Sequence, residues 1–383
     1  MEKKTNEFLI RLMLILLSMF IPIAAADLIL KQLNLPKQNG RIMLLGGGSL
    51  KTDEENLIRK YTPNRTIRHA AVYGKNVIYD YTFKTNKYGF RNTYSCNLET
   101  KNPIVAITGD SFTEGQGSKI SWTKDLQFKL CNIGTDSINL AMPGYGIIDM
   151  SNSLVFAKKR LNAEKAIFSI ITSDIYRRNA IMHSNAKCSA YYVTDLKLCG
   201  ISATWWHIPK EMNSKEIITF AKSKYKFGLR SSLSGLEKYA KNILKDVIRK
   251  ITYNNPSNFL KKTGIITAIP EKKEIIIKNS IQALNKIATI YKPENIILVI
   301  IPNKSDRIKS VKINHQMASK ESDLQNFLQL LDPSISKVDL RSCPLTSDHF
   351  YLKDGHPNKK GQQLIGQCVA NNISVKKFLN IDK

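Results

Sequence analysis

The sequence predicts an α/β fold built on a parallel sheet, and three features of the chain support this prediction. Short apolar runs of strand length recur, each run is closed by a turn residue, and stretches of helical length separate the runs. Strands that are apolar on both faces and joined by helices belong to a parallel sheet covered on both sides. We therefore predict a flavodoxin-like, doubly wound parallel sheet.

The predicted strands fall into an early group and a late one. The early group alternates strictly between strand and helix, in the order strand 103–108 (PIVAIT), helix 118–130, strand 137–141 (SINLA), helix 147–162 and strand 166–171 (AIFSII). A further strand, 295–301 (NIILVII), comes much later and stops at Pro302. The resulting βαβαβ order places the main domain at residues 101–383.

Residues 176–280 interrupt this alternation. An insertion of this length inside an α/β core is expected to fold as a mainly helical cap or subdomain at the carboxyl edge of the sheet, where the ligand crevice of such folds lies. It contains the pair Trp205 and Trp206. These rings would either stack on a sugar or acyl chain of a substrate or form the small core of the insertion.

The first 30 residues determine the predicted compartment. Lys3 and Lys4 precede an apolar stretch, residues 8–30, that is uncharged from Leu12 to Ala26. It has the length of a single-pass transmembrane anchor, and a cleaved signal peptide or a buried core helix are the alternatives. We favour the anchor because apolar residues continue to position 30. The anchor and the signal peptide would both export the rest of the chain, which predicts attachment to a bacterial inner membrane with the main domain in the periplasm or outside the cell.

Residues 31–100 are predicted to be a lead-in segment that packs on the main domain. The triple glycine Gly46–Gly48 lacks the Lys-Ser/Thr sequence that a phosphate-binding loop needs after it, so we predict an ordinary loop there.

The net charge of +27 admits three kinds of partner: nucleic acid, an anionic lipid or acidic glycan surface, or solvent alone. The lysines are scattered and no nucleic-acid motif accompanies them, so we favour solvated faces and expect no nucleic-acid partner.

Six cysteines permit disulfides in an exported chain, Cys188 with Cys199 being the favoured pair and free buried thiols the alternative. No zinc spacing occurs, and we expect no metal and no cofactor. The oligomeric state is not predicted.

Two distant motifs carry the chemistry. In the run Ile107 to Gly115 (ITGDSFTEG) a strand ends, a glycine turns the chain, and Ser111 stands where a helix begins. That arrangement exposes a hydroxyl beside free backbone N–H groups, although an N-cap serine in a structural turn has the same pattern. Near the C-terminus, Asp354 precedes His356 by two residues in a predicted turn. The two residues could act as a catalytic acid and base pair, or the turn could be an ordinary solvent-exposed loop.

These motifs resemble the conserved blocks of the SGNH (GDSL-type) hydrolases, in family order. The segment GDSFTEG is similar to the first block, Asn139–Gly144 (NLAMPG) to the second, and Asp354–Asn358 (DGHPN) to the last. The resemblance spans residues 101–372 apart from the insertion. It implies Ser111 as nucleophile, His356 as base, Asp354 as acid, and an oxyanion hole built from the N–H groups of Ser111 and Gly144.

The chain departs from that family pattern at two places. Ser173, before Asp174, stands where the family has an oxyanion-hole asparagine, and Asn179 is a speculative substitute. A single residue separates Asp354 from His356 where two are usual, and Asp348 is the reserve acid.

Residues 85–91 (TNKYGFR) resemble the lead-in of membrane-anchored members of the family. This resemblance leaves Arg91 to pair either with an internal acid, which we favour, or with a substrate carboxylate.

Together these features predict a serine esterase or acyltransferase that acts on acyl, and preferably acetyl, esters of envelope or extracellular glycans. One alternative is a lipase or lysophospholipase acting on a lipid ester. A second is a non-catalytic glycan-binding or assembly protein on the same fold, which Ser173 favours.

Overall fold

The computed structural model describes residues 41–92, 96, 102–177, 205–224, 273–304 and 314–381, apart from Glu54, Lys75 and Lys353. The chain divides into two compact units. The larger comprises residues 41–72, 77–213 and 272–383, and all the packing discussed below lies within it. Helix α5 (Ser214–Lys224) belongs to the smaller unit.

The larger unit contains a five-stranded sheet in which every pair of neighbours is parallel. In spatial order its strands are β8 (Asp136–Asn139), β7 (Ile104–Thr108), β9 (Lys165–Ile170), β11 (Ile296–Ile300) and β12 (Ser336–Asp339). Numbered along the chain this order is 2-1-3-4-5, the flavodoxin-like arrangement. The predicted parallel α/β sheet is confirmed, and the four predicted strands agree with the observed ones to within two residues at each end.

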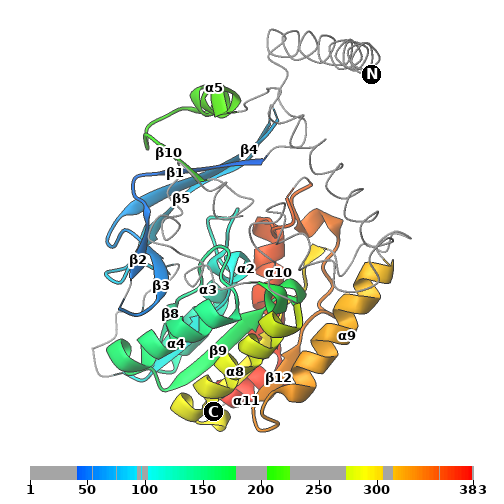
Figure 1. Ribbon diagram of the computed structural model, residues 1–383. Helices are drawn as coiled ribbons and strands as arrows, with labels where there is room; N and C mark the ends of the chain where they lie inside the picture. The colour runs from blue at the N-terminus through cyan, green and yellow to red at the C-terminus, as the bar shows by residue number, and fades with distance from the viewer. Residues whose placement is uncertain are drawn as a thin grey trace, which may run out of the picture. The chain divides into compact units, whose positions relative to one another are not determined.

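Helices cover both faces of this sheet (Figure 1). One layer consists of α4 (Ile147–Leu161), α8 (Lys273–Tyr291) and α9 (Asn314–Leu330), and the other of α3 (Thr123–Asn132), α10 (Lys359–Asn371) and α11 (Ile373–Leu379). Strand side chains alternate between the two cores, as the pleat requires. In β11, Leu298 joins the core under α4 and α8, whereas Ile297 and Val299 join the core under α3 and α10.

The lead-in segment forms a second sheet instead of a simple connection. Its five strands are, in spatial order, β10 (Trp205–Ile208), β1 (Arg41–Gly46), β4 (Thr66–Tyr73), β5 (Asn76–Thr85) and β6 (Arg91–Asn92). A separate antiparallel hairpin joins β2 (Leu50–Asp53) to β3 (Ile58–Tyr61), and residues 47–49 form the turn before it, where a loop is predicted. Tyr61 and Tyr81 of this segment share one core with Leu154 of α4, so the segment is built into the larger unit.

The predicted insertion is not one independent piece where the structure describes it. Strand β10 pairs in parallel with β1, with Trp205 opposite Met43 and Trp206 opposite Leu44. Helix α8 begins at Lys273, inside the predicted range, and packs against α4. At these two places the chain packs within the larger unit, and the cap or subdomain predicted at about 176–280 stays a prediction. Residues 178–204 and 225–272, including Cys188 and Cys199, lie outside the described ranges.

The predicted helix 118–130 is observed as α3, but its start was predicted five residues too early. A short helix, α2 (Ser111–Glu114), ends at Gly115, and α3 begins only at Thr123. Gly115 has φ +90°, and a Cβ there would lie 2.8 Å from Ser121. A left-handed residue ends a helix, and glycine adopts that conformation without steric cost.

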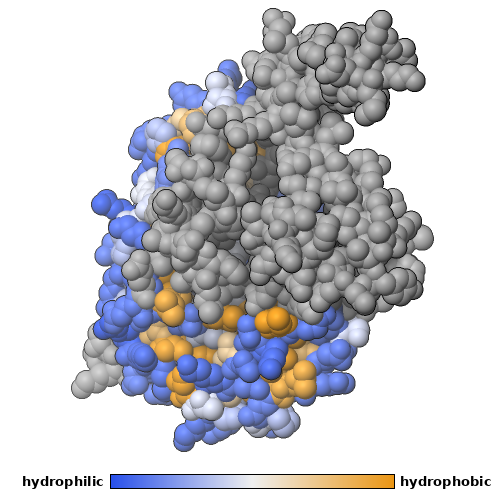
Figure 2. Space-filling model, viewed as in Figure 1, coloured by the Kyte–Doolittle hydropathy of each residue, from blue (hydrophilic) through white to orange (hydrophobic). Residues whose placement is uncertain are grey.

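The described surface is mainly hydrophilic. On the face seen in Figure 2, hydrophilic side chains cover most of the described surface and hydrophobic ones form separated patches. No described helix is long and apolar enough to cross a bilayer. The predicted anchor, residues 1–30, lies outside the part of the chain that is described.

The four cysteines in the described ranges form two disulfides, Cys96–Cys131 and Cys343–Cys368. The first joins the region after the lead-in sheet to α3. The second joins the segment after β12 to α10 and closes a loop with a sequence separation of 25.

We expect the Cys343→Ser/Cys368→Ser variant to lose about 3.5 kcal/mol of unfolding free energy, the loop-closure entropy that a bridge of this span removes from the unfolded chain. Urea unfolding of the variant and of wild type, with and without reductant, measures the loss. The Cys96→Ser/Cys131→Ser variant, whose bridge spans a sequence separation of 35, is the control and is expected to lose a similar amount. Unchanged stability in the first variant would show that this bridge does not constrain the chain.

Candidate active site

Ser111 stands at the carboxyl end of β7, as the first residue of α2. Asp110 caps this helix by accepting a hydrogen bond of 2.8 Å from Phe112 N–H. Gly109 allows the turn, because a Cβ there would lie 2.3 Å from Thr113 Oγ1 and 2.9 Å from the Ser169 carbonyl oxygen. The turn leaves the Ser111 hydroxyl at the sheet edge next to β9, the point where the strand order reverses and where ligands bind in such sheets.

His356 and Asp354 meet Ser111 at this edge. Ser111 Oγ lies 2.8 Å from His356 Nε2, and His356 Nδ1 lies 2.5 Å from Asp354 Oδ1. An ionised Asp354 accepts a hydrogen bond from Nδ1–H, which leaves Nε2 without a proton and able to accept a hydrogen bond from the Ser111 hydroxyl. Ser111, His356 and Asp354 are 5%, 8% and 4% exposed as whole residues. The three residues therefore form a serine–histidine–aspartate chain of hydrogen bonds in a largely dry site.

Helix α10 holds the imidazole in place. His356 precedes this helix by three residues, and Asn358 caps it by accepting from Gly361 N–H. Within α10, Gln362 donates to the Phe112 carbonyl and accepts from Trp122 N–H at 2.8 Å. Figure 1 shows α2 and α10 side by side, as these bonds require. The distance between Ser111 and His356 is thus fixed by buried polar contacts between their two helices.

The loop that carries Asp354 and His356 is held from the other side by Lys304. Lys304 follows β11 in the chain, and its ammonium group donates to the carbonyl oxygens of Tyr351 and Leu352 at 2.7 and 3.0 Å. The Tyr351 hydroxyl donates to the Gly117 carbonyl, just beyond α2. The loop is therefore tied both to the sheet edge and to the turn after the serine helix.

The backbone N–H groups of Ser111 and Gly144 are the candidate oxyanion donors. Tyr145 N–H donates to the Met142 carbonyl at 3.2 Å, with Pro143 and Gly144 between them and Gly144 at φ +77°. Proline and left-handed glycine at these positions are the pattern of a type II turn, which leaves the glycine N–H outside the turn's hydrogen bond. Neither Ser111 N–H nor Gly144 N–H donates to any residue in the described ranges. Met142 N–H donates to the Gly109 carbonyl, which joins this turn to the one that carries Ser111.

The remaining predicted site residues take other places. Ser173 lies half-buried in the 3-10 turn η1 (Thr172–Tyr176) after β9, and no hydrogen bond joins it to the three residues of the triad. Asp348, the reserve acid, is exposed, and its neighbour His349 bonds to Thr346. The backbone of Trp205 and Trp206 lies in β10 of the second sheet. Asn179 lies beyond the described residues.

A buried ion pair lies beneath the serine helix. Arg91 and Glu114 have fully buried side chains, with Nη1 and Oε1 3.5 Å apart. Arg91 also donates to the carbonyls of Gly115 at 2.8 Å and Ser118 at 2.5 Å, beyond the end of the helix. Burial raises the pKa of Glu114, and the charge of Arg91 opposes that shift. Of the two uses predicted for Arg91, the structure shows pairing with an internal acid.

Sequence reasoning missed the polar residues that support the triad: Tyr145, Arg177, Lys304 and Gln362. Arg177 and Lys304 each follow a strand at the carboxyl edge, and that position was the available signal. Tyr145 and Gln362 bond to segments distant in sequence, Tyr145 to Arg59 and Gln362 to Trp122, and no local pattern marks such pairs.

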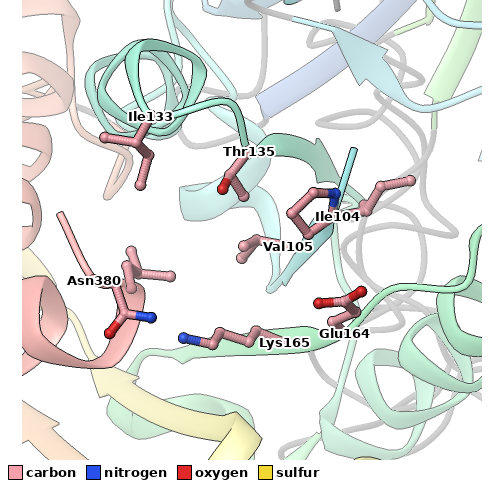
Figure 3. A pocket seen from close by; sticks show the side chains of 9 residues that line it. Ile104, Val105, Ile133, Thr135, Glu164, Lys165 and Asn380 are labelled. Atoms are coloured by element: carbon pink, nitrogen blue, oxygen red, sulfur yellow. The ribbon is translucent and has the colours of Figure 1, made fainter. Parts of the chain in front are cut away.

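A cavity of about 360 Å³ lies at the opposite edge of the sheet (Figure 3). Ile104 and Lys165 line it where β7 and β9 begin, together with Ile133 and Asn380. Ser111 follows the other end of β7, so this cavity is not part of the triad site. Within the described ranges, no cluster of three or more His, Cys, Asp or Glu side chains is arranged to hold a metal ion.

No protein-family model matches the sequence, and a comparison with curated proteins gives no match. Among solved structures, the chain is similar to the lipase/acylhydrolase from Enterococcus faecalis, with 10% identity, a TM-score of 0.33, and 73% of this chain and 96% of that one covered. It is similar to the psychrotrophic esterase EstA from Pseudoalteromonas sp., with 14% identity, a TM-score of 0.36, and 73% and 100% covered.

A third similar structure is the family 3 carbohydrate esterase of Clostridium thermocellum, with 13% identity, a TM-score of 0.31, and 70% of this chain and 93% of that one covered. These likenesses are too distant to assign an activity. The case for an enzyme rests on the geometry of the triad.

The raised pKa of Glu114 has a consequence for stability. In the unfolded chain a glutamate has a pKa of about 4.3. Because the folded state binds this proton more tightly, the stabilisation from Glu114 is fully present below that pH and is lost as the pH rises through the folded pKa. We expect the unfolding free energy of wild type, minus that of Glu114→Gln, to fall as the pH rises from 4 to 8.

Chemical denaturation across this pH range measures that difference in unfolding free energy. The unpaired Arg91 of the variant adds an offset to the difference that does not change with pH. Glu55→Gln is the control, since Glu55 pairs with Arg160 on the surface and is 74% exposed. A difference that stays flat with pH for Glu114→Gln would contradict the raised pKa.

Proposed function

We propose that this chain is a serine esterase or acyltransferase that forms a covalent acyl-enzyme at Ser111. The observation that supports the proposal is the continuous chain from Ser111 Oγ through His356 to Asp354, at 2.8 and 2.5 Å, beside two backbone N–H groups without partners among the described residues. A structural N-cap serine needs neither a buried imidazole nor a carboxylate behind it.

In the first step His356 Nε2 removes the Ser111 hydroxyl proton as Oγ attacks the ester carbonyl carbon. The carbonyl oxygen becomes an oxyanion, which the N–H groups of Ser111 and Gly144 stabilise. Asp354 stabilises the imidazolium that forms. The bond to the leaving alcohol oxygen then breaks, that oxygen takes the proton from His356, and the acyl group stays on Ser111.

In the second step an acceptor hydroxyl attacks the acyl-enzyme while His356 removes its proton. The bond to Ser111 Oγ breaks, and Oγ recovers a proton from the imidazolium. Water as the acceptor makes the enzyme an esterase, and a sugar hydroxyl makes it an acyltransferase. No step requires a group beyond this chain, the ester and the acceptor.

The proposed substrates are acyl esters, with acetyl esters of envelope or extracellular glycans preferred. This preference follows the resemblance of the three motifs and the expected export of the chain. A lipase acting on long acyl chains uses the same triad, so chain-length preference distinguishes the two. The rival without catalysis, a glycan-binding protein on this fold, is favoured by Ser173, whose hydroxyl replaces an amide donor.

We expect purified protein to hydrolyse p-nitrophenyl acetate and Ser111→Ala to lower kcat by about 10⁶-fold, the loss that follows removal of a triad nucleophile. Asp354→Asn is expected to lower kcat by about 10⁴-fold, because the imidazole then has the wrong tautomer. Asp348→Asn is the matched control and is expected to retain wild-type kcat. Equal activity in wild type and Ser111→Ala would exclude covalent catalysis at this serine.

A series of p-nitrophenyl esters from acetate to palmitate tests the substrate class. We expect kcat/KM to be highest for acetate and to fall as the acyl chain lengthens. A maximum at eight carbons or more would indicate the lipase. No turnover of any member, together with no labelling of Ser111 by a fluorophosphonate, would indicate the binding protein.

We further propose that residues 1–30 anchor the chain in a bacterial inner membrane, with the triad outside the cytosol. Two disulfides in the described ranges support an oxidising compartment. Cell fractionation of the full chain is expected to place it in the membrane pellet. Externally added protease is expected to digest the main domain in spheroplasts. Protection of that domain from the protease, or a soluble full-length chain, would contradict the proposal.

A further inference from the structure

We propose that Arg177 is a positioning residue that holds the Gly144 N–H in register with Ser111. This inference rests on the acyl transfer proposed above and names a residue that acts through the oxyanion site without entering the reaction. The evidence is the set of contacts made by one guanidinium nitrogen.

Arg177 Nη1 joins the carboxyl ends of three adjacent strands. It lies 2.9 Å from Asp110 Oδ2, 3.2 Å from the Tyr145 carbonyl oxygen and 3.1 Å from Asp174 Oδ1. These partners follow β7, β8 and β9 respectively. The guanidinium therefore contacts the three segments that follow β7, β8 and β9, whose relative positions determine the geometry of the proposed site.

Two of these contacts lie next to the reacting groups. Asp110 caps the serine helix through Phe112 N–H, and its Oδ2 lies 3.4 Å from Ser111 Oγ. Tyr145 directly follows Gly144, whose N–H is the second proposed oxyanion donor. A shift of Arg177 therefore changes the position of both donors relative to each other.

The Tyr145 segment is also held at its far side. The Tyr145 hydroxyl donates to the Arg59 carbonyl at 2.5 Å and accepts from Arg59 N–H at 3.1 Å, on β3 of the lead-in. A Cβ on Gly146 would lie 2.9 Å from the Arg177 carbonyl oxygen, so the two backbones touch there. Tyr145 is thus clamped between Arg59 and Arg177, and Arg177 links its carbonyl to the side chain of Asp110, the cap of the serine helix.

Arginine suits this position for a chemical reason. A guanidinium presents several N–H donors in a rigid plane, whereas a lysine ammonium is a compact charge on a flexible stem. The Arg177 side chain is 29% exposed, so it lies at the edge of the site instead of in a sealed core.

The test uses wild type, Arg177→Met and Arg177→Lys. Each is assayed for kcat and KM on p-nitrophenyl acetate and for inhibition by a trifluoromethyl ketone, which forms a tetrahedral adduct on a catalytic serine. We expect kcat to fall by about 10²-fold in Arg177→Met, the cost of a displacement of roughly 1 Å in a catalytic geometry. The inhibition constant is expected to rise by the same factor while KM stays unchanged. Arg177→Lys is expected to give values between those of wild type and Arg177→Met, because it keeps the charge but carries it on a flexible stem.

Arg341→Met is the matched control. Arg341 follows β12 and pairs with two carboxylates, Asp339 and Glu321, away from Ser111. It is expected to lower the thermal midpoint about as much as Arg177→Met does and to leave kcat and the inhibition constant unchanged.

The outcomes separate this inference from the proposed function. Wild-type kcat and inhibition in both Arg177 variants would overturn the positioning role while leaving the esterase in place. A rise in KM with unchanged kcat would overturn it in favour of substrate binding. If Arg177→Met does not fold, Arg177→Lys decides by the same criteria. A wild type that neither turns over the ester nor binds the ketone would overturn the proposed function, and the positioning role with it.

Discussion

The hydrogen bond between Ser111 Oγ and His356 Nε2 joins two residues separated by 245 positions, and the rest of the site depends on it. The parallel sheet brings the first of them to its carboxyl edge, because β7 ends in a turn that glycine alone allows. The second arrives on the loop before α10, which is fixed by Gln362 against the serine helix and by Lys304 against β11. Hydrophobic packing assembles the layers, and these few directional contacts set the distance between the two side chains.

Charged side chains are concentrated at the serine helix. Arg91 pairs with Glu114 at the end of the helix, and Arg177 pairs with Asp110, its cap, and with Asp174. Ion pairs of this kind add little net stability, since the cost of desolvating both charges offsets their attraction. Their use here is geometric, because each arginine also donates to backbone carbonyls and so fixes the path of the chain. The lead-in segment takes part through Arg91 of β6 and through the backbone of Arg59 of β3, and it is a structural component of the site.

Local patterns predicted the parallel sheet and identified Ser111, Asp354 and His356 as candidate site residues. This was possible because apolar strands and glycine turns can be recognised in short stretches of sequence. The second sheet was not predicted, since β10 pairs with β1 across some 160 residues and such pairing has no local signature. The helix at 118–130 was predicted to begin five residues too early for a related reason: the path of the chain before Thr123 depends on contacts such as that of the left-handed Gly115 with Ser121. Supporting residues such as Tyr145 and Gln362 act on distant segments, so only the folded chain reveals them.

The central claim is that Ser111, His356 and the Gly144 N–H act on one carbonyl group. A crystal structure of the protein after reaction with an alkyl phosphonate ester tests this most directly. The account predicts phosphorus bonded to Ser111 Oγ, with His356 Nε2 within hydrogen-bond distance of Oγ or of the leaving-group position. It also predicts a phosphonyl oxygen within about 3 Å of the N–H groups of Ser111 and Gly144. An adduct on another residue, or a phosphonyl oxygen turned away from both N–H groups, would contradict it.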